Sequence, residues 1–166
     1  MESKAKFLGH SVHQMLIVFP LGLLATAVAF DVAWLATDMP AMAAVSYWLL
    51  VAGLLGALVA APFGFIDWLA IPRGTRARRI GALHGSGNVV VTLLFLTSWM
   101  LRESADVEPA ALAIGLGIVG ALIALVTAWL GGELVARLGV GVYDDANLDA
   151  PNSLDAHPPR ERAHGH

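Results

Sequence analysis

Three histidines at the starts of apolar segments are the side chains in this chain best suited to chemistry. His10 and His13 stand three residues apart at the start of the first apolar segment, and His84 has the corresponding place in the third. Residues three apart share one face of a helix, so His10 and His13 can point at the same place. Imidazole nitrogens bind transition metals and the iron of haem. The histidines therefore predict a cofactor site if the fold brings them together.

Two carboxylates belong to the same candidate site, because Asp67 ends the second apolar segment and Glu133 lies near the end of the fourth. Two or three imidazoles with a carboxylate make a divalent-metal site, whereas two imidazoles on different helices suffice as axial ligands of a b-type haem. The candidate haem ligands are His13 and His84, with His10 as a further cofactor-binding residue. The candidate metal ligands are His10, His13, Asp67, His84 and Glu133.

Structural roles can also account for these residues. The histidines could hydrogen-bond within a helix bundle, Asp67 could pair with nearby arginines, and Glu133 could pair with Arg137, four residues on. The sequence has no Ser-His-Asp arrangement, phosphate loop or HExxH motif, and we therefore expect it not to be an enzyme. Because the chain has no cysteine, disulfides, thiol chemistry and covalent c-type haem attachment are excluded.

The elements that carry these residues are long apolar segments. Hydrophobic residues make up 57% of the 166 residues and charged residues 14%, whereas a soluble domain has about 25% charged residues. Such runs cross a bilayer as helices, because backbone in lipid must satisfy its own hydrogen bonds. The sequence predicts an all-α, integral membrane, up-down-up-down four-helix bundle over residues 1–142 and a disordered tail over 143–166. The expected helices cover residues 12–37, 43–70, 81–101 and 110–138.

Basic residues predict how the bundle lies in the membrane. Lys4 and Lys6 precede the first segment, and four arginines lie between the second and third segments, whereas the other two loops share one arginine. By the positive-inside rule, both termini and the arginine-rich loop face the cytoplasm. Topology thus accounts for the arginines, and no nucleic-acid partner is expected.

Antiparallel packing sorts the polar residues into two layers. The starts of the first and third helices and the ends of the second and fourth share one membrane face, which brings all five candidate ligands into one cytoplasmic-side layer. Asp31 follows His13 by 18 residues, and Arg102 follows His84 by 18. This spacing equals five helical turns, a rise of about 27 Å. We therefore expect Asp31 and Arg102 to form a structural pair near the outer surface.

Several short stretches resemble one widespread bacterial family. They are Gly9 to Leu23, Gly64 to Trp68, the stretch 76–84, Ser98 to Arg102, and Gly131 to Leu134 followed by Gly139 to Val142. In this order they resemble the membrane family called domain of unknown function 2231, over residues 8–142. Gln14 stands where the family often has a proline. The resemblance implies four membrane helices and no assigned activity. Some relatives are fused to Rieske iron–sulfur or cytochrome c domains, which implies electron transfer.

Three functions remain open from the sequence. The first is a b-type haem or redox-linked membrane protein, with His13 and His84 as ligands. The second is a divalent-metal-binding or metal-ion pathway protein, and the third is a non-catalytic membrane subunit or scaffold whose polar layer is structural. The lipid bilayer is the expected partner in each case, and a redox partner protein and a homo-oligomer are further candidates.

Overall fold

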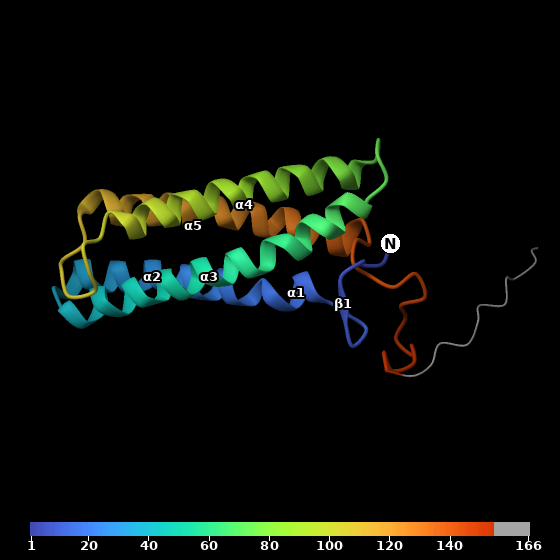
Figure 1. The fold of residues 1–166 in the computed structure, drawn as a ribbon, viewed down its shortest axis with the longest axis horizontal. Coiled ribbons are helices and arrows are strands. Elements are labelled where there is room, and N and C mark those ends of the chain that lie inside the picture. Colours follow the sequence, from blue (N-terminus) through green and yellow to red (C-terminus); the bar gives the residue numbers. More distant parts are fainter. Residues whose placement is uncertain (155–166) are drawn as a thin grey trace, which may run out of the picture.

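Four long helices make up most of the structure, which is a computed structural model describing residues 1–154 (Figure 1). The first membrane span consists of α1 and α2, and the fourth of α5 and a π-helical turn, η1. Each of the four spans is long and apolar enough to cross a bilayer. The elements are β1 (Lys6–Phe7), β2 (His10–Ser11), α1 (Val12–Leu16), α2 (Val18–Thr37), α3 (Pro40–Ala70), α4 (Arg76–Met100), α5 (Ala111–Gly132) and η1 (Glu133–Arg137). The predicted all-α four-helix bundle is confirmed.

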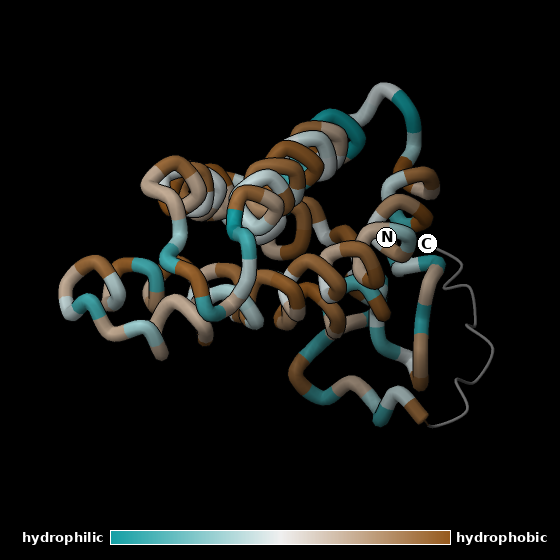
Figure 2. The backbone as a smooth tube through the Cα atoms, turned by 60° about the vertical axis from the view of Figure 1, so that its left-hand side comes forward, coloured by the Kyte–Doolittle hydropathy of each residue, from teal (hydrophilic) through white to brown (hydrophobic). Residues whose placement is uncertain are grey.

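The bundle is built from two helical hairpins, α2–α3 and α4–α5, that lie against each other (Figure 1). The core between them consists of Leu24, Ala27, Leu50, Leu54, Val91 and Phe95. In each span, at most 28% of the most apolar 18-residue stretch is buried inside the protein. Most residues along the helices are hydrophobic, and hydrophilic residues gather mainly near the ends (Figure 2). Because this surface would be unfavourable in water, it contacts the lipid bilayer.

Two helices begin earlier than the sequence predicts. Helix α3 starts at Pro40 rather than near residue 43. Proline suits the first helical position because its fixed φ is helical and because the backbone N–H that it lacks would have no partner within the helix. Helix α4 starts at Arg76 rather than near residue 81. The Thr75 side chain caps it by accepting from the Arg78 backbone N–H at 3.1 Å. Much of the predicted basic loop is therefore the first turn of a helix.

The first span is interrupted at Ile17, which separates α1 from α2. Pro20 has no N–H to donate to the carbonyl of Leu16, so the regular hydrogen-bond ladder is lost here. The interruption makes α1 a separate short helix, and α1 carries His13.

The N-terminal segment and the described residues after η1 fold together at the end of the bundle that carries the α3–α4 loop, here called the terminal end (Figure 1). The opposite end, with the α2–α3 and α4–α5 loops, is called the far end. Strands β1 and β2 pair as an antiparallel hairpin, with Lys6 opposite Ser11 and Phe7 opposite His10. The Met1 ammonium donates to the carbonyl of Gly139 at 2.8 Å.

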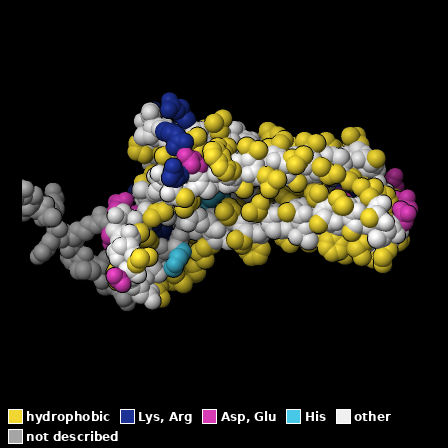
Figure 3. All heavy atoms as spheres, turned by 180° about the vertical axis from the view of Figure 1, so that it is seen from behind, with side chains coloured by type: hydrophobic (Ala, Val, Ile, Leu, Met, Phe, Trp, Pro, Cys, Tyr) yellow, Lys and Arg dark blue, Asp and Glu magenta, His cyan; other side chains and the backbone are white. Residues whose placement is uncertain are grey.

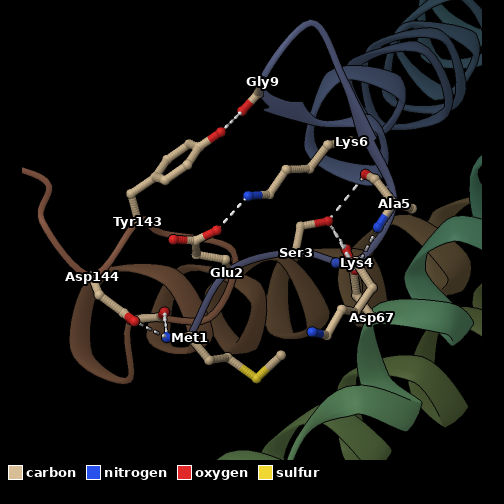
Figure 4. A network of polar contacts seen from close by, with 11 residues as sticks. Met1, Glu2, Ser3, Lys4, Ala5, Lys6, Gly9, Asp67, Tyr143 and Asp144 are labelled. Carbon is tan, nitrogen blue, oxygen red and sulfur yellow. Dashed lines mark hydrogen bonds and ion pairs between the residues drawn. The ribbon is translucent and has the colours of Figure 1, made fainter. Parts of the chain in front are cut away.

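Residues 143–154 of the expected tail contain no helix or strand, but the first of them contacts the N-terminal hairpin. The Tyr143 hydroxyl donates to the carbonyl of Gly9 at 2.6 Å, and the Lys6 ammonium lies 4.1 Å from the centre of the Tyr143 ring (Figure 4). Although burial opposes the charged form, hydrogen bonds to the Glu2 carboxylate and to Tyr143 raise the pKa of Lys6. The composition of the segment could not reveal these distant partners. Residues 155–166 of the expected tail lie outside the described residues.

Candidate functional site

His84 lies near the start of α4 and hydrogen-bonds to α5. Its Nδ1 is 2.8 Å from the carbonyl oxygen of Thr127, and a carbonyl can only accept, so Nδ1 carries the proton. Its Nε2 accepts from the side-chain amide of Asn88 at 3.1 Å, and the Thr127 hydroxyl donates to the Asn88 carbonyl oxygen at 2.9 Å. The three side chains thus form a closed set in which His84 is the neutral Nδ1–H tautomer.

His13 binds to α3 in the same manner. Its Nδ1 lies 3.1 Å from the carbonyl oxygen of Ala60, which again places the proton on Nδ1. The Nε2 atom of His13 has no hydrogen-bond partner among the described residues. Both imidazoles lie near the same end of the bundle, since His13 stands at the start of the first span and His84 near the start of the third. The structure therefore brings His13 and His84 into the same layer, one from each hairpin.

A glycine one turn after the accepting carbonyl makes room for each imidazole. Gly64 follows Ala60 by four residues, and a methyl group on Gly64 would lie 2.6 Å from Cε1 of His13. Gly131 follows Thr127 by four residues, and a methyl group there would lie 3.1 Å from Cε1 of His84. Each hairpin thus repeats one arrangement: a histidine on its first helix, and a carbonyl and a glycine on its second.

The other three candidate ligands have different surroundings. His10 is exposed on β2, with Nδ1 3.1 Å from the carbonyl oxygen of Leu8. Glu133 accepts from Arg76 at 2.7 Å rather than pairing with Arg137. Glu133 therefore joins the π-helical turn to the start of α4.

Asp67 is buried and anchors the N-terminal segment (Figure 4). Both of its oxygens lie 2.8 Å from the Ser3 hydroxyl. The backbone N–H groups of Lys4 and Ala5 donate to one of these oxygens at 2.7 and 3.3 Å. The alternative partners suggested by the sequence, the nearby arginines, do not bind it. Arg78 instead donates to the carbonyls of Trp68, Leu69 and Ile71 at the end of α3.

The five candidate metal ligands do not converge. Among residues 1–154, no group of three or more histidine, cysteine, aspartate or glutamate side chains could hold a metal ion. The physical reason is that the two carboxylates are used elsewhere, Asp67 by the N-terminal segment and Glu133 by Arg76. The five side chains lie at a similar depth in the membrane, but they do not point to one place.

A buried ion pair joins the two hairpins near the far end. The Nη1 and Nη2 atoms of Arg102 lie 2.9 and 2.6 Å from the two oxygens of Asp31. Both side chains are at most 2% exposed, and Nη1 also lies 3.3 Å from the Ser46 hydroxyl of α3. Two parallel hydrogen bonds of this kind are the strongest form of the arginine–carboxylate pair.

Sequence reasoning missed Ser3 and Thr127 and gave Asn88 no role. A signal existed for Asn88, which follows His84 by four residues and so shares its helix face. For Thr127 and Ser3 no local signal exists, because their partners lie 39 and 64 residues away in the sequence.

The fold and these contacts define an integral membrane protein with four membrane-spanning helices. A family model described as predicted membrane protein, DUF2231, matches residues 9–144. The chain belongs to this family, as the sequence resemblance indicated. No curated protein and no solved structure matches the chain.

Proposed function

We propose that this chain is a membrane-embedded electron-transfer protein that binds a b-type haem, with His13 and His84 as axial ligands. One observation carries the proposal. Each imidazole donates its Nδ1–H to a backbone carbonyl of the neighbouring helix, which directs the lone pair of Nε2 away from that helix. Histidines that bind metals usually have their second nitrogen fixed in this way.

The donor set of the layer fits such a group. Both rings carry a proton on Nδ1, and they come from opposite hairpins. Nε2 of His13 has no partner among the described residues, whereas Nε2 of His84 becomes available only when the Asn88 amide turns away from it. When bound, a b-type haem carries one electron at its iron, and the protein sets the potential through ligands, hydrogen bonds and burial.

The residues of the chain then have distinct roles. The carbonyls of Ala60 and Thr127 hold the imidazoles in place, and Asn88 and Thr127 polarise His84. Asp67 holds the N-terminal segment against the terminal end of the bundle.

The proposal includes a bacterial inner membrane, with the terminal end in the cytoplasm. Basic side chains gather at the terminal end, together with some acidic ones, whereas the far end shows acidic side chains without basic ones on this face (Figure 3). Arg76, Arg78 and Arg79 all stand in the first turn of α4. The positive-inside rule supports this orientation.

Absorption spectroscopy tests the haem proposal. We expect the purified protein, produced with haem supplied, to show a reduced-minus-oxidised b-type band. His13→Ala and His84→Ala should abolish the band, whereas His10→Ala, which alters an exposed histidine outside the bundle, should keep it. A wild-type protein without the band would refute the proposal.

A structural role for the layer is the competing function, and the closed set of His84, Asn88 and Thr127 favours it. In this case the chain is a non-catalytic subunit or scaffold. Alanine at His84 would then lower thermal stability while leaving the spectrum and metal content unchanged. The divalent-metal alternative has less support, because no group of three ligand side chains occurs among the described residues.

A further inference from the structure

The hairpin formed by β1 and β2 ends in a turn whose tip is apolar and unburied. Phe7 and Leu8 are 60% and 61% exposed, although both are large hydrophobic side chains. Leu8 and Gly9 connect the paired residues Phe7 and His10, and both have positive φ, 48° and 84°. Positive φ at both central residues is typical of a type I′ turn, in which asparagine followed by glycine is the favoured pair.

Leucine is an unusual residue for the first central position of this turn. In the left-handed region the Cβ atom comes too close to the backbone, a strain that glycine avoids and asparagine tolerates better. The turn itself therefore gives no reason for a leucine, and an exposed leucine in water gains nothing from burial. Strain and exposure at the same apolar side chain point to a contact outside the protein.

The backbone carbonyls of the turn are hydrogen-bonded to side chains. The carbonyl of Gly9 accepts from the Tyr143 hydroxyl at 2.6 Å (Figure 4). The carbonyl of Leu8 accepts from the Ser153 hydroxyl at 3.4 Å and lies 3.1 Å from Nδ1 of His10. In water, solvent would supply such partners, whereas in lipid the protein must supply them itself. The tip can therefore leave water without losing a hydrogen bond at either carbonyl.

The turn lies where the first span enters the membrane. Strand β2 ends at Ser11, and the span begins at Val12. Val12 follows Leu8 by four positions, so the two residues lie within roughly 14 Å of each other. The hairpin lies beside the start of α1, and its turn points sideways from the long axis of the bundle (Figure 1). Met15 of α1 is 48% exposed and borders the same surface hollow as Gly9. Apolar surface thus continues from the turn to the first span.

We propose that the tip of this hairpin, Phe7 and Leu8, inserts into the bilayer interface as a lipid contact additional to the four spans. Lys4 is exposed, and the Lys6 ammonium lies on the ring of Tyr143. Lysine and tyrosine side chains suit the headgroup layer, because each has an apolar body and a polar tip. The inference goes beyond the haem proposal and does not depend on it, since the tip meets lipid with or without a bound haem.

Nitroxide labels measure the depth of the tip, because the chain has no cysteine of its own. The labels are attached to Phe7→Cys and Leu8→Cys in the full-length protein, reconstituted in phosphatidylcholine nanodiscs. Oxygen concentrates in lipid, whereas a nickel chelate remains in water. We expect the ratio of oxygen to nickel collisions to be several-fold higher at both positions than at Asn147→Cys, an exposed position of the same end.

Two results of the labelling would overturn the proposal. A collision ratio equal to that of Asn147→Cys would place the tip in water. Low collision rates with both reagents would show that the tip is covered by protein, such as a second copy of the chain. Thermal melting of each labelled variant shows that it is folded.

Leu8→Asn separates lipid contact from the folding of the turn, because asparagine suits this turn better than leucine. In nanodiscs we expect trypsin to cleave after Lys6 several-fold faster in this variant, since the hairpin loses its hold on the bilayer. Leu148→Asn, the same change at a fully exposed leucine outside the hairpin, should be cleaved there at the wild-type rate. Unchanged or slower cleavage of Leu8→Asn would show that the leucine has no lipid contact, and the proposal would then be wrong. The haem band, recorded on the same samples, tests the proposed function separately.

Discussion

At the scale of single residues, the imidazoles of His13 and His84 are held by backbone carbonyls rather than by charged side chains. His13 and His84 each bind a carbonyl of a facing helix, and each packs on a glycine of that helix. The absence of a side chain at Gly64 and Gly131 thus places the rings. Small residues are often interpreted as helix-packing positions. Here two of them accommodate histidines.

Replacement of Gly64 tests this arrangement. In Gly64→Ala the added methyl group would lie 2.6 to 3.0 Å from three atoms of the His13 ring, so the ring must move. We expect a loss of about 1–3 kcal/mol in stability, as for other overpacked sites. Unfolding in mixed detergent micelles measures the loss.

The matched control for Gly64→Ala is Gly85→Ala. Gly85 lies within α4, and nothing lies within 4 Å of a methyl group placed there. Alanine should be neutral or stabilise by up to about 1 kcal/mol through its helix propensity. If both variants lose the same stability, contact with His13 is not the cause.

At the scale of elements, the Asp31–Arg102 pair joins α2 to the end of α4 and, through Ser46, to α3. It links the two hairpins by charge near the far end, whereas the terminal end has the imidazole contacts within each hairpin. The buried pair is costly to break, since removal of one partner leaves the other charge unpaired in an apolar environment.

A double-mutant cycle tests the pair. Arg102→Met alone should destabilise the protein by about 3–5 kcal/mol, because the Asp31 carboxylate loses its partner. The double variant Asp31→Leu with Arg102→Met should recover most of this loss, since an apolar pair has no charge to bury. Additive losses in the double variant would contradict coupling between the two residues.

The N-terminal segment is a second element that depends on one carboxylate. Asp67→Asn keeps the size of the side chain but removes the charge that Ser3, Lys4 and Ala5 bind. We expect trypsin to cleave after Lys4 and Lys6 several-fold faster in this variant, because the segment is released more often. Glu133→Gln, which alters the other carboxylate of the layer, should leave the cleavage rate unchanged.

At the scale of the whole molecule, the four spans form a pair of similar hairpins, and the N-terminal segment and the described residues after η1 lie at one end (Figure 1). The first and third spans, which begin the two hairpins, space their polar residues equally. His13 and Asp31 are 18 residues apart, and so are His84 and Arg102. The histidines of the two hairpins lie in the terminal layer, and the ion pair joins the hairpins near the far end. The two hairpins thus place their polar residues in the same way.

The orientation in the membrane can be measured directly because the chain has no cysteine. A single cysteine in Asp106→Cys lies at the far end, and one in Asn147→Cys lies at the terminal end; both positions are exposed. A membrane-impermeant maleimide should label the first in intact spheroplasts and the second only after lysis. The opposite pattern would show that the positive-inside rule fails for this protein.

The sequence by itself determined the four spans and the level of each polar residue along the membrane normal. Hydrophobic length decides whether a helix crosses a bilayer, and an 18-residue spacing returns a helix to the same face. These are local properties, so the terminal layer and the level of Asp31 and Arg102 could be predicted. The contact of Tyr143 with Gly9 could not, because the two residues are 134 positions apart in the sequence.

Only the tertiary structure decided which groups meet within a layer. Asp67 and Glu133 are at the level of the histidines, yet they bind the N-terminal segment and Arg76. His84 binds a carbonyl whose position depends on how α5 packs against α4. The level of a residue follows from helix periodicity, but its partner depends on the rotation and packing of separate helices, which no single segment encodes.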